Sequence, residues 1–205
     1  MSRRPPAEIL AALERLGVRL GLDSLRALLE RLDDPQRGLP AVLVAGTNGK
    51  GSTAAMLDAV VRAAGLRAGL YTSPHLERVE ERIRIGGAPI DAALLAAALE
   101  SVLGAARGAG LETPTYFEAV TAAAFLAFAE ARVELAVLEV GLGGRLDATN
   151  LSDPLVSVIT PIALDHTEWL GRSLAEVAHE KAGVMRAGRP VVLAPQEPEA
   201  ARALL

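Results

Sequence analysis

One run of residues sets the fold class of this chain: Ala41-Val42-Leu43-Val44-Ala45-Gly46-Thr47-Asn48-Gly49-Lys50-Gly51-Ser52-Thr53. The apolar residues 41–45 predict a strand that is buried on both faces. A glycine-rich loop follows, and residues 52–64 predict a helix that ends at Gly65. Residues 68–71 then return to an extended pattern. Strand, loop, helix and strand in this order predict an α/β fold, with a mostly parallel sheet flanked by helices.

The rest of the chain continues this alternation. Residues 7–32 predict two short helices, and residues 82–90 alternate and turn in a way that is typical of a small hairpin. Further strands are predicted at 135–140, 156–160 and 190–194, and further helices at 91–107, 116–131 and 174–185. In the helix at 116–131 a single apolar stripe is expected, made of Phe117, Val120, Ala124 and Phe128.

Length and composition exclude several classes of protein. A chain of 205 residues can bury a core without disulfides or metals, and it has no cysteine for a thiol nucleophile or a thiolate metal site. The net charge of -4 and the 3% aromatic content argue against a nucleic-acid partner. Uncharged apolar runs are too short to span a membrane, and the first residues do not form a signal peptide. We therefore expect a soluble, cytoplasmic protein with no membrane partner.

The loop after the first strand has the properties of a phosphate-binding loop. Small residues let backbone N–H groups surround phosphate oxygens at a helix start, and Lys50 adds a positive charge. The strict P-loop pattern is not met, because Val44 and Gly51 stand where it requires Gly and Ser or Thr. The alternative is a glycine-rich connection with an exposed lysine. The predicted nucleotide-binding residues are Thr47, Asn48, Gly49, Lys50, Gly51, Ser52 and Thr53.

Polar residues follow the other predicted strands, at the edge where open α/β sheets bind ligands. Ser73 follows one strand, Glu139 ends another and His166 comes after a third. Two oxygen ligands and one nitrogen suit a magnesium ion that bridges ATP phosphates. Taken singly, Ser73 can be a turn residue, Glu139 a salt-bridged strand end and His166 a surface histidine.

Several motifs, in order over about residues 40–195, resemble the folylpolyglutamate synthase and dihydrofolate synthase family of the Mur-ligase superfamily. That family's loop also lacks Gly at the position of Val44 and has Gly after the lysine, so the departure from the strict P-loop supports the resemblance. The most specific motif is 139–150, Glu-Val-Gly-Leu-Gly-Gly-Arg-Leu-Asp-Ala-Thr-Asn. The other matching segments are 46–53, 72–76, 81–83, 115–118, 165–171 and 180–183.

The resemblance implies roles for individual residues. Lys50 would bind the β- and γ-phosphates of ATP, and Ser73, Glu139 and His166 would ligate Mg²⁺. Lys181 would be carbamylated and help to hold a second Mg²⁺, so that Lys50, His166 and Lys181 form the catalytic set. Without that modification, Lys181 is an ordinary basic residue of an amphipathic helix.

The resemblance also implies a substrate site. Thr115 and Phe117 match positions near a pterin ring, and Asp147 matches a carboxylate that can hydrogen-bond its edge. Arg82 can help to attract anionic substrates, although surface arginines are usually only solvated. Phe117 also fits the apolar helix stripe, which leaves a core role open.

The implied reaction is ATP-dependent ligation. ATP phosphorylates the carboxylate of dihydropteroate or a folate, and the amine of L-glutamate attacks the acyl phosphate to form an amide. Two other classes stay open: another Mur-type amide ligase, and a non-catalytic P-loop nucleotide-binding domain.

In the family a second, glutamate-binding domain follows. We therefore expect a P-loop NTPase-like Mur-ligase central domain at 39–205, an N-terminal helical segment at 1–38, and a chain that is a monomer and inactive alone.

Overall fold

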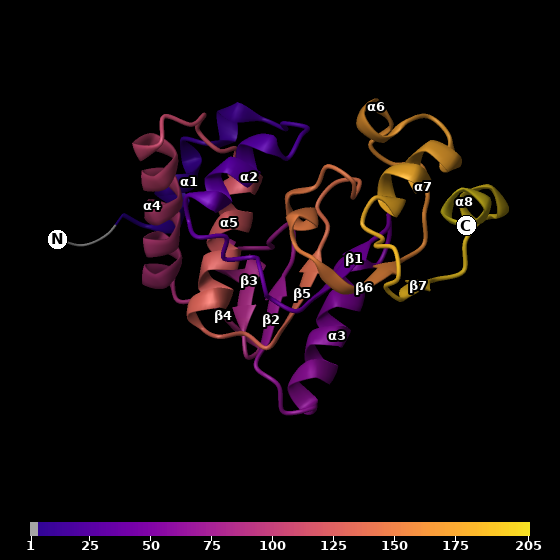
Figure 1. Ribbon diagram of the computed structural model, residues 1–205, viewed down its shortest axis with the longest axis horizontal. Coiled ribbons are helices and arrows are strands. Elements are labelled where there is room, and N and C mark those ends of the chain that lie inside the picture. Colours follow the sequence, from indigo (N-terminus) through magenta and orange to yellow (C-terminus); the bar gives the residue numbers. More distant parts are fainter. Residues whose placement is uncertain (1–3) are drawn as a thin grey trace.

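The computed structural model describes residues 4–205 (Figure 1). Within that range, seven strands form one sheet in the order β4-β3-β2-β5-β1-β6-β7. The strands β2, β5, β1, β6 and β7 are parallel, and β3 and β4 add an antiparallel hairpin at one edge. The bounds are β1 Ala41–Ala45, β2 Ala68–Tyr71, β3 Ile83–Ile85, β4 Ala88–Pro89, β5 Leu135–Glu139, β6 Pro154–Ile159 and β7 Val191–Leu193. The predicted α/β fold and its hairpin are confirmed.

The helices lie close to their predicted positions, with shifts at their ends. The helix after the loop begins at Lys50, two residues early, and the helix predicted to end at 185 ends at Ala182. Two short helices, α6 and α8, were not among the predicted helices. The bounds are α1 Pro6–Ala11, α2 Asp23–Glu30, α3 Lys50–Ala63, α4 Ala92–Gly108, α5 Tyr116–Glu130, α6 Thr167–Leu170, α7 Leu174–Ala182 and α8 Pro198–Leu204, with 3₁₀ turns η1 Glu14–Leu16, η2 Val79–Arg82 and η3 Ala148–Leu151. None of the helices described is long and apolar enough to cross a bilayer.

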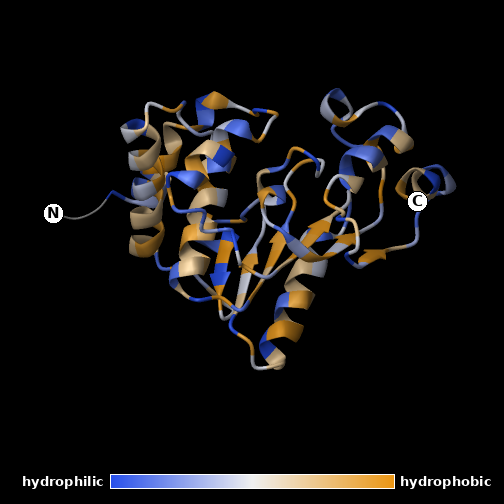
Figure 2. Cartoon of the chain, in the orientation of Figure 1, coloured by the Kyte–Doolittle hydropathy of each residue, from blue (hydrophilic) through white to orange (hydrophobic). Residues whose placement is uncertain are grey.

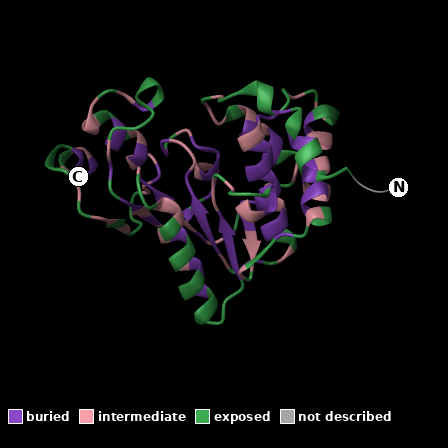
Figure 3. Cartoon of the chain, turned by 180° about the vertical axis from the view of Figure 1, so that it is seen from behind, coloured by how far each residue is buried: buried purple, intermediate pink, exposed green. Residues whose placement is uncertain are grey.

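The central strands are apolar on both faces, as Figure 2 shows by their colour. Because side chains alternate along a strand, Val44 of β1 packs toward α3 while Leu43 packs toward α5 and its neighbours. The outer side of α3 is exposed (Figure 3), where Met56 and Val60 face solvent. The sheet is therefore sandwiched between α3 and the helices of the opposite layer.

The helix α5 lies at the centre of that opposite layer and is buried nearly all round. Residues 118–125 are all buried, so the predicted single stripe is too narrow. Close packing of this helix on the sheet needs Gly69 in β2, since a Cβ there would lie 2.9 Å from the ring of Phe128. Phe117, at the start of α5, is only half-buried.

The N-terminal helices share the same core. Leu10 of α1 and Leu25 and Leu29 of α2 are fully buried in the cluster that α4 and α5 form. The N-terminal segment is therefore packed on the domain. The division at residue 38 stays a prediction.

Candidate active site

The glycine loop leaves β1 in the cleft between two parallel strands. Gly46 lies against β6 so closely that a Cβ would collide with the side chain of Thr160. Gly49 caps α3 with φ of 82°, a left-handed conformation that glycine adopts without strain. The helix then starts at Lys50, so the amides of Lys50, Gly51 and Ser52 have no acceptor within it. These amides provide the anion-binding helix start that the sequence predicts.

The first part of the loop is anchored to the end of β6. The N–H groups of Thr47 and Asn48 both donate to the carbonyl of Pro161, at 3.1 and 3.3 Å. The Thr47 hydroxyl donates to the carbonyl of Ala163 and accepts from its N–H. The predicted nucleotide-binding residues thus divide into two groups. Thr47 and Asn48 anchor the loop to the end of β6, and the residues from Gly49 onward form the cap and first turn of α3.

Two lysines, the only ones in the chain, meet at this loop. Lys50 Nζ donates to the carbonyl of Thr47 at 3.3 Å, and Lys181 Nζ, from α7, donates to the carbonyl of Gly46 at 2.8 Å. Lys181 is buried. Burial, with repulsion from Lys50, lowers the pKa of Lys181 to about 8. The structure therefore brings two of the three predicted catalytic residues together.

Ser73 and Glu139 also meet, as the parallel pairing of β2 and β5 requires. The Ser73 N–H donates to Glu139 Oε2 at 2.9 Å. Burial raises the pKa of Glu139, while the Ser73 N–H and Lys50 oppose that rise. Gly51 leaves the carboxylate room, since a Cβ there would lie 3.4 Å from both oxygens. All three residues line a polar pocket of about 390 Å³.

This pocket suits a magnesium ion in its donor chemistry. The Ser73 hydroxyl and the Glu139 carboxylate are hard oxygen donors, and Mg²⁺ keeps several waters beside one or two such ligands. Residues 4–205 contain no group of three or more His, Asp or Glu side chains placed to hold a metal by themselves. A site here would therefore rely on water and phosphate oxygens for its other ligands.

His166 is not joined to this pair by any hydrogen bond of the described residues. It occupies the left-handed region with φ of 48° just before α6, and its side chain is 54% exposed. Its Nε2 lies 3.7 Å from an oxygen of Asp165. The role of His166 as a third metal ligand stays a prediction.

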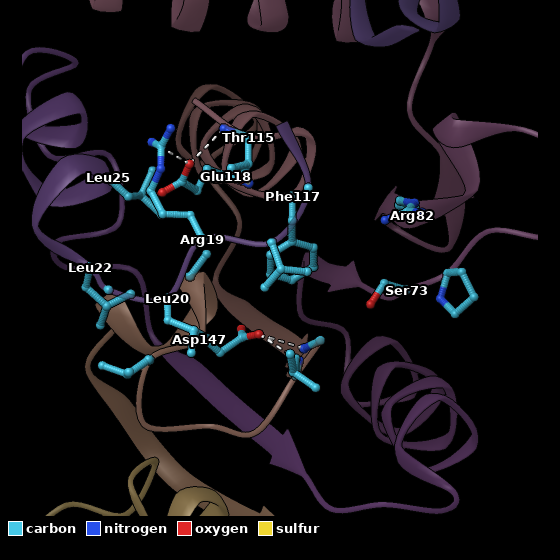
Figure 4. A pocket seen from close by; sticks show the side chains of 18 residues that line it. Arg19, Leu20, Leu22, Leu25, Ser73, Arg82, Thr115, Phe117, Glu118 and Asp147 are labelled. Carbon is cyan, nitrogen blue, oxygen red and sulfur yellow. Dashed lines mark hydrogen bonds and ion pairs between the residues drawn. The ribbon is translucent and has the colours of Figure 1, made fainter. Parts of the chain in front are cut away.

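A second, mainly apolar cavity of about 310 Å³ adjoins the polar pocket, and the two share Ser73 and Pro74 (Figure 4). Arg82, Thr115, Phe117 and Asp147, the four predicted substrate residues, all line this cavity. The structure thus brings together side chains that lie 65 positions apart in the sequence.

Phe117 lines the cavity and also packs against the hydrophobic core cluster. Its ring stands 6.1 Å from that of buried Tyr71, and Gly141 passes close to its edge. Thr115 caps α5: its hydroxyl accepts the Glu118 N–H while the Glu118 carboxylate accepts the Thr115 N–H. The aromatic face is therefore held at the cavity by a helix start with a capping box.

The close approach of Gly141 predicts a defect in Gly141→Ala. An added Cβ would lie 2.6 Å from Phe117 Cζ, so the ring must move and the free energy of unfolding should fall by about 1–3 kcal/mol. Gly104→Ala is the matched control, because nothing lies within 4 Å of a Cβ there and alanine favours the helix α4. Urea unfolding of both variants measures the difference, and equal stability of the two would contradict the packing of Phe117 on Gly141.

Arg82 and Asp147 are both engaged by neighbouring groups. Arg82 Nε donates to His75 Nδ1 at 2.9 Å, and the guanidinium lies 5.1 Å from the centre of the Tyr116 ring. Asp147 is buried and accepts four hydrogen bonds from its own loop. Arg82 is thus oriented by two partners, and Asp147 shapes the loop that forms one wall of the cavity.

The cavity has a further wall that was not predicted, formed by residues 17–22 and Leu25. In the sequence this segment showed only two glycines, Gly17 and Gly21, around the apolar residues Val18 and Leu20. A short apolar stretch between glycines marks a turn, and its place over the cavity depends on packing with α5.

A glycine loop anchored between parallel strands, with a lysine and a buried carboxylate beside it, defines a nucleotide-binding α/β domain. The chain belongs to the Mur ligase middle domain family, which matches residues 44–193. The expected resemblance to folylpolyglutamate and dihydrofolate synthases is confirmed by similarity over most of the chain.

Three known proteins illustrate that similarity. A probable bifunctional folylpolyglutamate synthase/dihydropteroate synthase of Haloferax volcanii is 47% identical over 182 residues, which is 88% of this chain and 22% of that protein. The structure of E. coli FolC with DHPP and ADP matches with a TM-score of 0.90 and 40% identity, over 98% of this chain and 48% of the other. A bifunctional folylpolyglutamate synthase/dihydrofolate synthase with Mn, AMPPNP and L-glutamate bound matches with a TM-score of 0.87 and 43% identity, over 98% and 49%. The chain therefore spans about half the length of the solved chains and less of the Haloferax protein.

Proposed function

We propose that this chain is the ATP-binding and folate-binding part of a ligase that joins L-glutamate to dihydropteroate or a folate. The observation that carries the proposal is that the polar pocket beside the glycine loop and the apolar cavity with Phe117 share Ser73 and Pro74 as lining residues. A flat heterocycle stacked on Phe117 would extend its tail toward the phosphate loop. The relatives whose structures hold ADP with DHPP, or AMPPNP with Mn and L-glutamate, support the same assignment. The setting we propose is the cytoplasm, with ATP and Mg²⁺ as cofactors and the chain as a monomer.

The proposed reaction has two transfers. An oxygen of the substrate carboxylate attacks the γ-phosphorus of ATP and ADP leaves; the glutamate amine then attacks the acyl carbon, loses a proton and expels phosphate. The chain's part is to hold and neutralise charge: Lys50 and the amides of Gly51 and Ser52 face the phosphates. Magnesium held by Ser73 and Glu139 would supply further neutralisation of the phosphate oxygens.

We also propose that Lys181 is carbamylated, which would place a carboxylate beside the loop. The step joins the neutral amine to CO₂, forming an N–C bond and releasing one proton. At pH 8, about half of a population of lysines with a pKa of about 8 is neutral. With the ordinary pKa, less than about 1% is neutral at that pH. Burial of Lys181 against the carbonyl of Gly46 therefore favours the modification.

This proposal gives a pH-dependent prediction. At a fixed concentration of dissolved ¹³CO₂, the Lys181 carbamate signal in ¹³C NMR should rise as pH increases from about 7 to 8.5, because the neutral amine becomes more abundant. Lys181→Arg serves as the control, since it leaves only Lys50 and the N-terminal amine to react. A spectrum of the unaltered chain identical to that of Lys181→Arg would exclude the carbamate.

Binding to this chain tests the proposed function directly. Calorimetry should show binding of ATP with Mg²⁺ and, separately, of dihydropteroate. ADP release in the presence of ATP, Mg²⁺, dihydropteroate and L-glutamate should be negligible, because the chain spans about half of the solved chains that it matches. Absence of binding of either ligand would refute the proposal, and glutamate-dependent turnover would refute the need for a further domain.

A further inference from the structure

The segment Gly17–Leu22 connects η1 to α2 and forms one wall of the apolar cavity. Its apolar side chains lie on the surface although the core is near: Val18 is 56% exposed and Leu20 47% exposed. Neither side chain belongs to the buried core cluster, whereas Leu25, in the first turn of α2, does. Apolar groups that line a cavity without joining the core are available to a ligand.

Residues 18–20 of this wall lie between two glycines, Gly17 and Gly21. Gly17 has φ of 61° and Gly21 has φ of 124°, and an added Cβ at either would meet nothing within 4 Å. Both positions therefore have the conformational freedom of glycine and open space around them. The three residues between them, Val18, Arg19 and Leu20, are absent from the buried core cluster, so a rotation at the two glycines would displace no side chain of that cluster.

One side chain ties this segment to the rest of the domain. Arg19 reaches the connection before α5, where its guanidinium lies 3.4 Å from Glu112, donates to the Thr113 carbonyl at 3.3 Å and lies 3.5 Å from Glu118. Figure 4 shows Arg19 directed toward Glu118 and Thr115, with Leu20 on the side of Asp147. The three contacts are each long, so the tie holds the segment in place and can still be released.

The anchor at the other end of this tie is fixed. Glu118 Oε2, which faces Arg19, also accepts the Thr115 N–H at 2.7 Å, and the Glu118 side chain is only 7% exposed. Arg19 thus links the segment to the capping box that positions α5, and Phe117 lies within that first turn. Arg19 is therefore placed to influence where Val18 and Leu20 lie relative to Phe117.

We propose that Gly17–Leu22 is a hinged wall of the substrate cavity and that Arg19 is the positioning residue that latches it. The latched segment holds Val18 and Leu20 against a flat, weakly polar ligand whose other face lies toward Phe117. The inference rests on the proposed function for the identity of the ligand, a pteroate or folate. Arg19 itself need not touch the ligand.

The test compares Arg19→Ala with Arg26→Ala in the full chain. Arg26 is the matched control, since it lies in α2 and, among residues 4–205, its side chain pairs with the exposed Asp23. Two quantities are measured: the rate of thermolysin cleavage within residues 17–22, and the dissociation constants for dihydropteroate and for ATP. A third variant, Glu112→Gln, weakens the latch by removing the charge of the Glu112 carboxylate that pairs with Arg19. Because Glu112 is exposed, this variant should fold even if Arg19→Ala does not.

Arg19→Ala should accelerate cleavage in this segment and raise the dissociation constant for dihydropteroate about threefold to tenfold, mainly through faster dissociation. ATP affinity should not change, Arg19→Lys should recover part of the loss, and Glu112→Gln should shift both measurements in the same direction. Unchanged cleavage, or faster cleavage with unchanged dihydropteroate affinity, would overturn the proposal. If the unaltered chain binds no dihydropteroate, the proposed function fails, while the cleavage rates still decide whether Arg19 latches the segment.

Discussion

Replacing Lys50 by alanine is expected to raise the dissociation constant of this chain for ATP by at least about 100-fold. Each hydrogen bond to a charged group contributes about 1.5–3 kcal/mol, and in the proposed function the Lys50 ammonium binds two phosphates. No other lysine can replace it, because Lys181, the only other one, is buried and donates to the carbonyl of Gly46. Isothermal titration calorimetry with ATP and Mg²⁺ measures the loss.

Two controls make that result specific. Arg107→Ala removes one positive charge from the last turn of α4, far along the chain from the loop, and should leave ATP affinity unchanged. Dihydropteroate affinity should survive Lys50→Ala, because Lys50 does not line the apolar cavity. The same variant should also raise the pKa of Lys181, since repulsion from Lys50 contributes to its low value. ATP affinity equal to that of the unaltered chain would exclude Lys50 from the nucleotide site.

The central strands, the phosphate loop and the Ser73–Glu139 pair could all be predicted from the sequence. Runs such as 41–45 and 135–138 are apolar at every position, which identifies strands buried on both faces. Once the strands are parallel, the residues at their carboxyl ends must share one edge of the sheet, and Ser73 and Glu139 meet there.

The features that the sequence did not predict depend on tertiary packing. The segment 17–22 carries no periodic pattern, and its place over the cavity follows from the contact of Arg19 with residues about 94–99 positions away. The burial of α5 on nearly all sides follows from the elements that cover it, which the small residues of 119–124 permit but do not specify. The sequence motif likewise shows only that Asp147 is a carboxylate, because its hydrogen-bond partners are set by the folded loop.

Asp147 organises the loop that leads from β5 into η3. Its Oδ2 accepts the N–H groups of Gly141 and Leu142, both at 3.0 Å, and its Oδ1 accepts the N–H and the hydroxyl of Thr149, at 3.0 and 2.6 Å. Burial raises the pKa of Asp147, and these four donors oppose the rise. Since a carboxylate has about four lone-pair sites, its accepting capacity is taken up by its own chain. A ligand donor would therefore have to share carboxylate oxygens that already accept from the loop.

Asp147→Ala is consequently expected to lower the free energy of unfolding by about 3–5 kcal/mol, because it leaves buried donors of Thr149 and two loop amides without an acceptor. Asp147→Asn keeps one accepting oxygen and should lose about half as much. Asp153→Ala, which removes an exposed carboxylate paired only with Arg189, should change stability by no more than about 0.5 kcal/mol. Urea unfolding followed by circular dichroism ranks the three variants. A loss in Asp147→Ala no larger than that in Asp153→Ala would mean that the loop does not depend on this carboxylate.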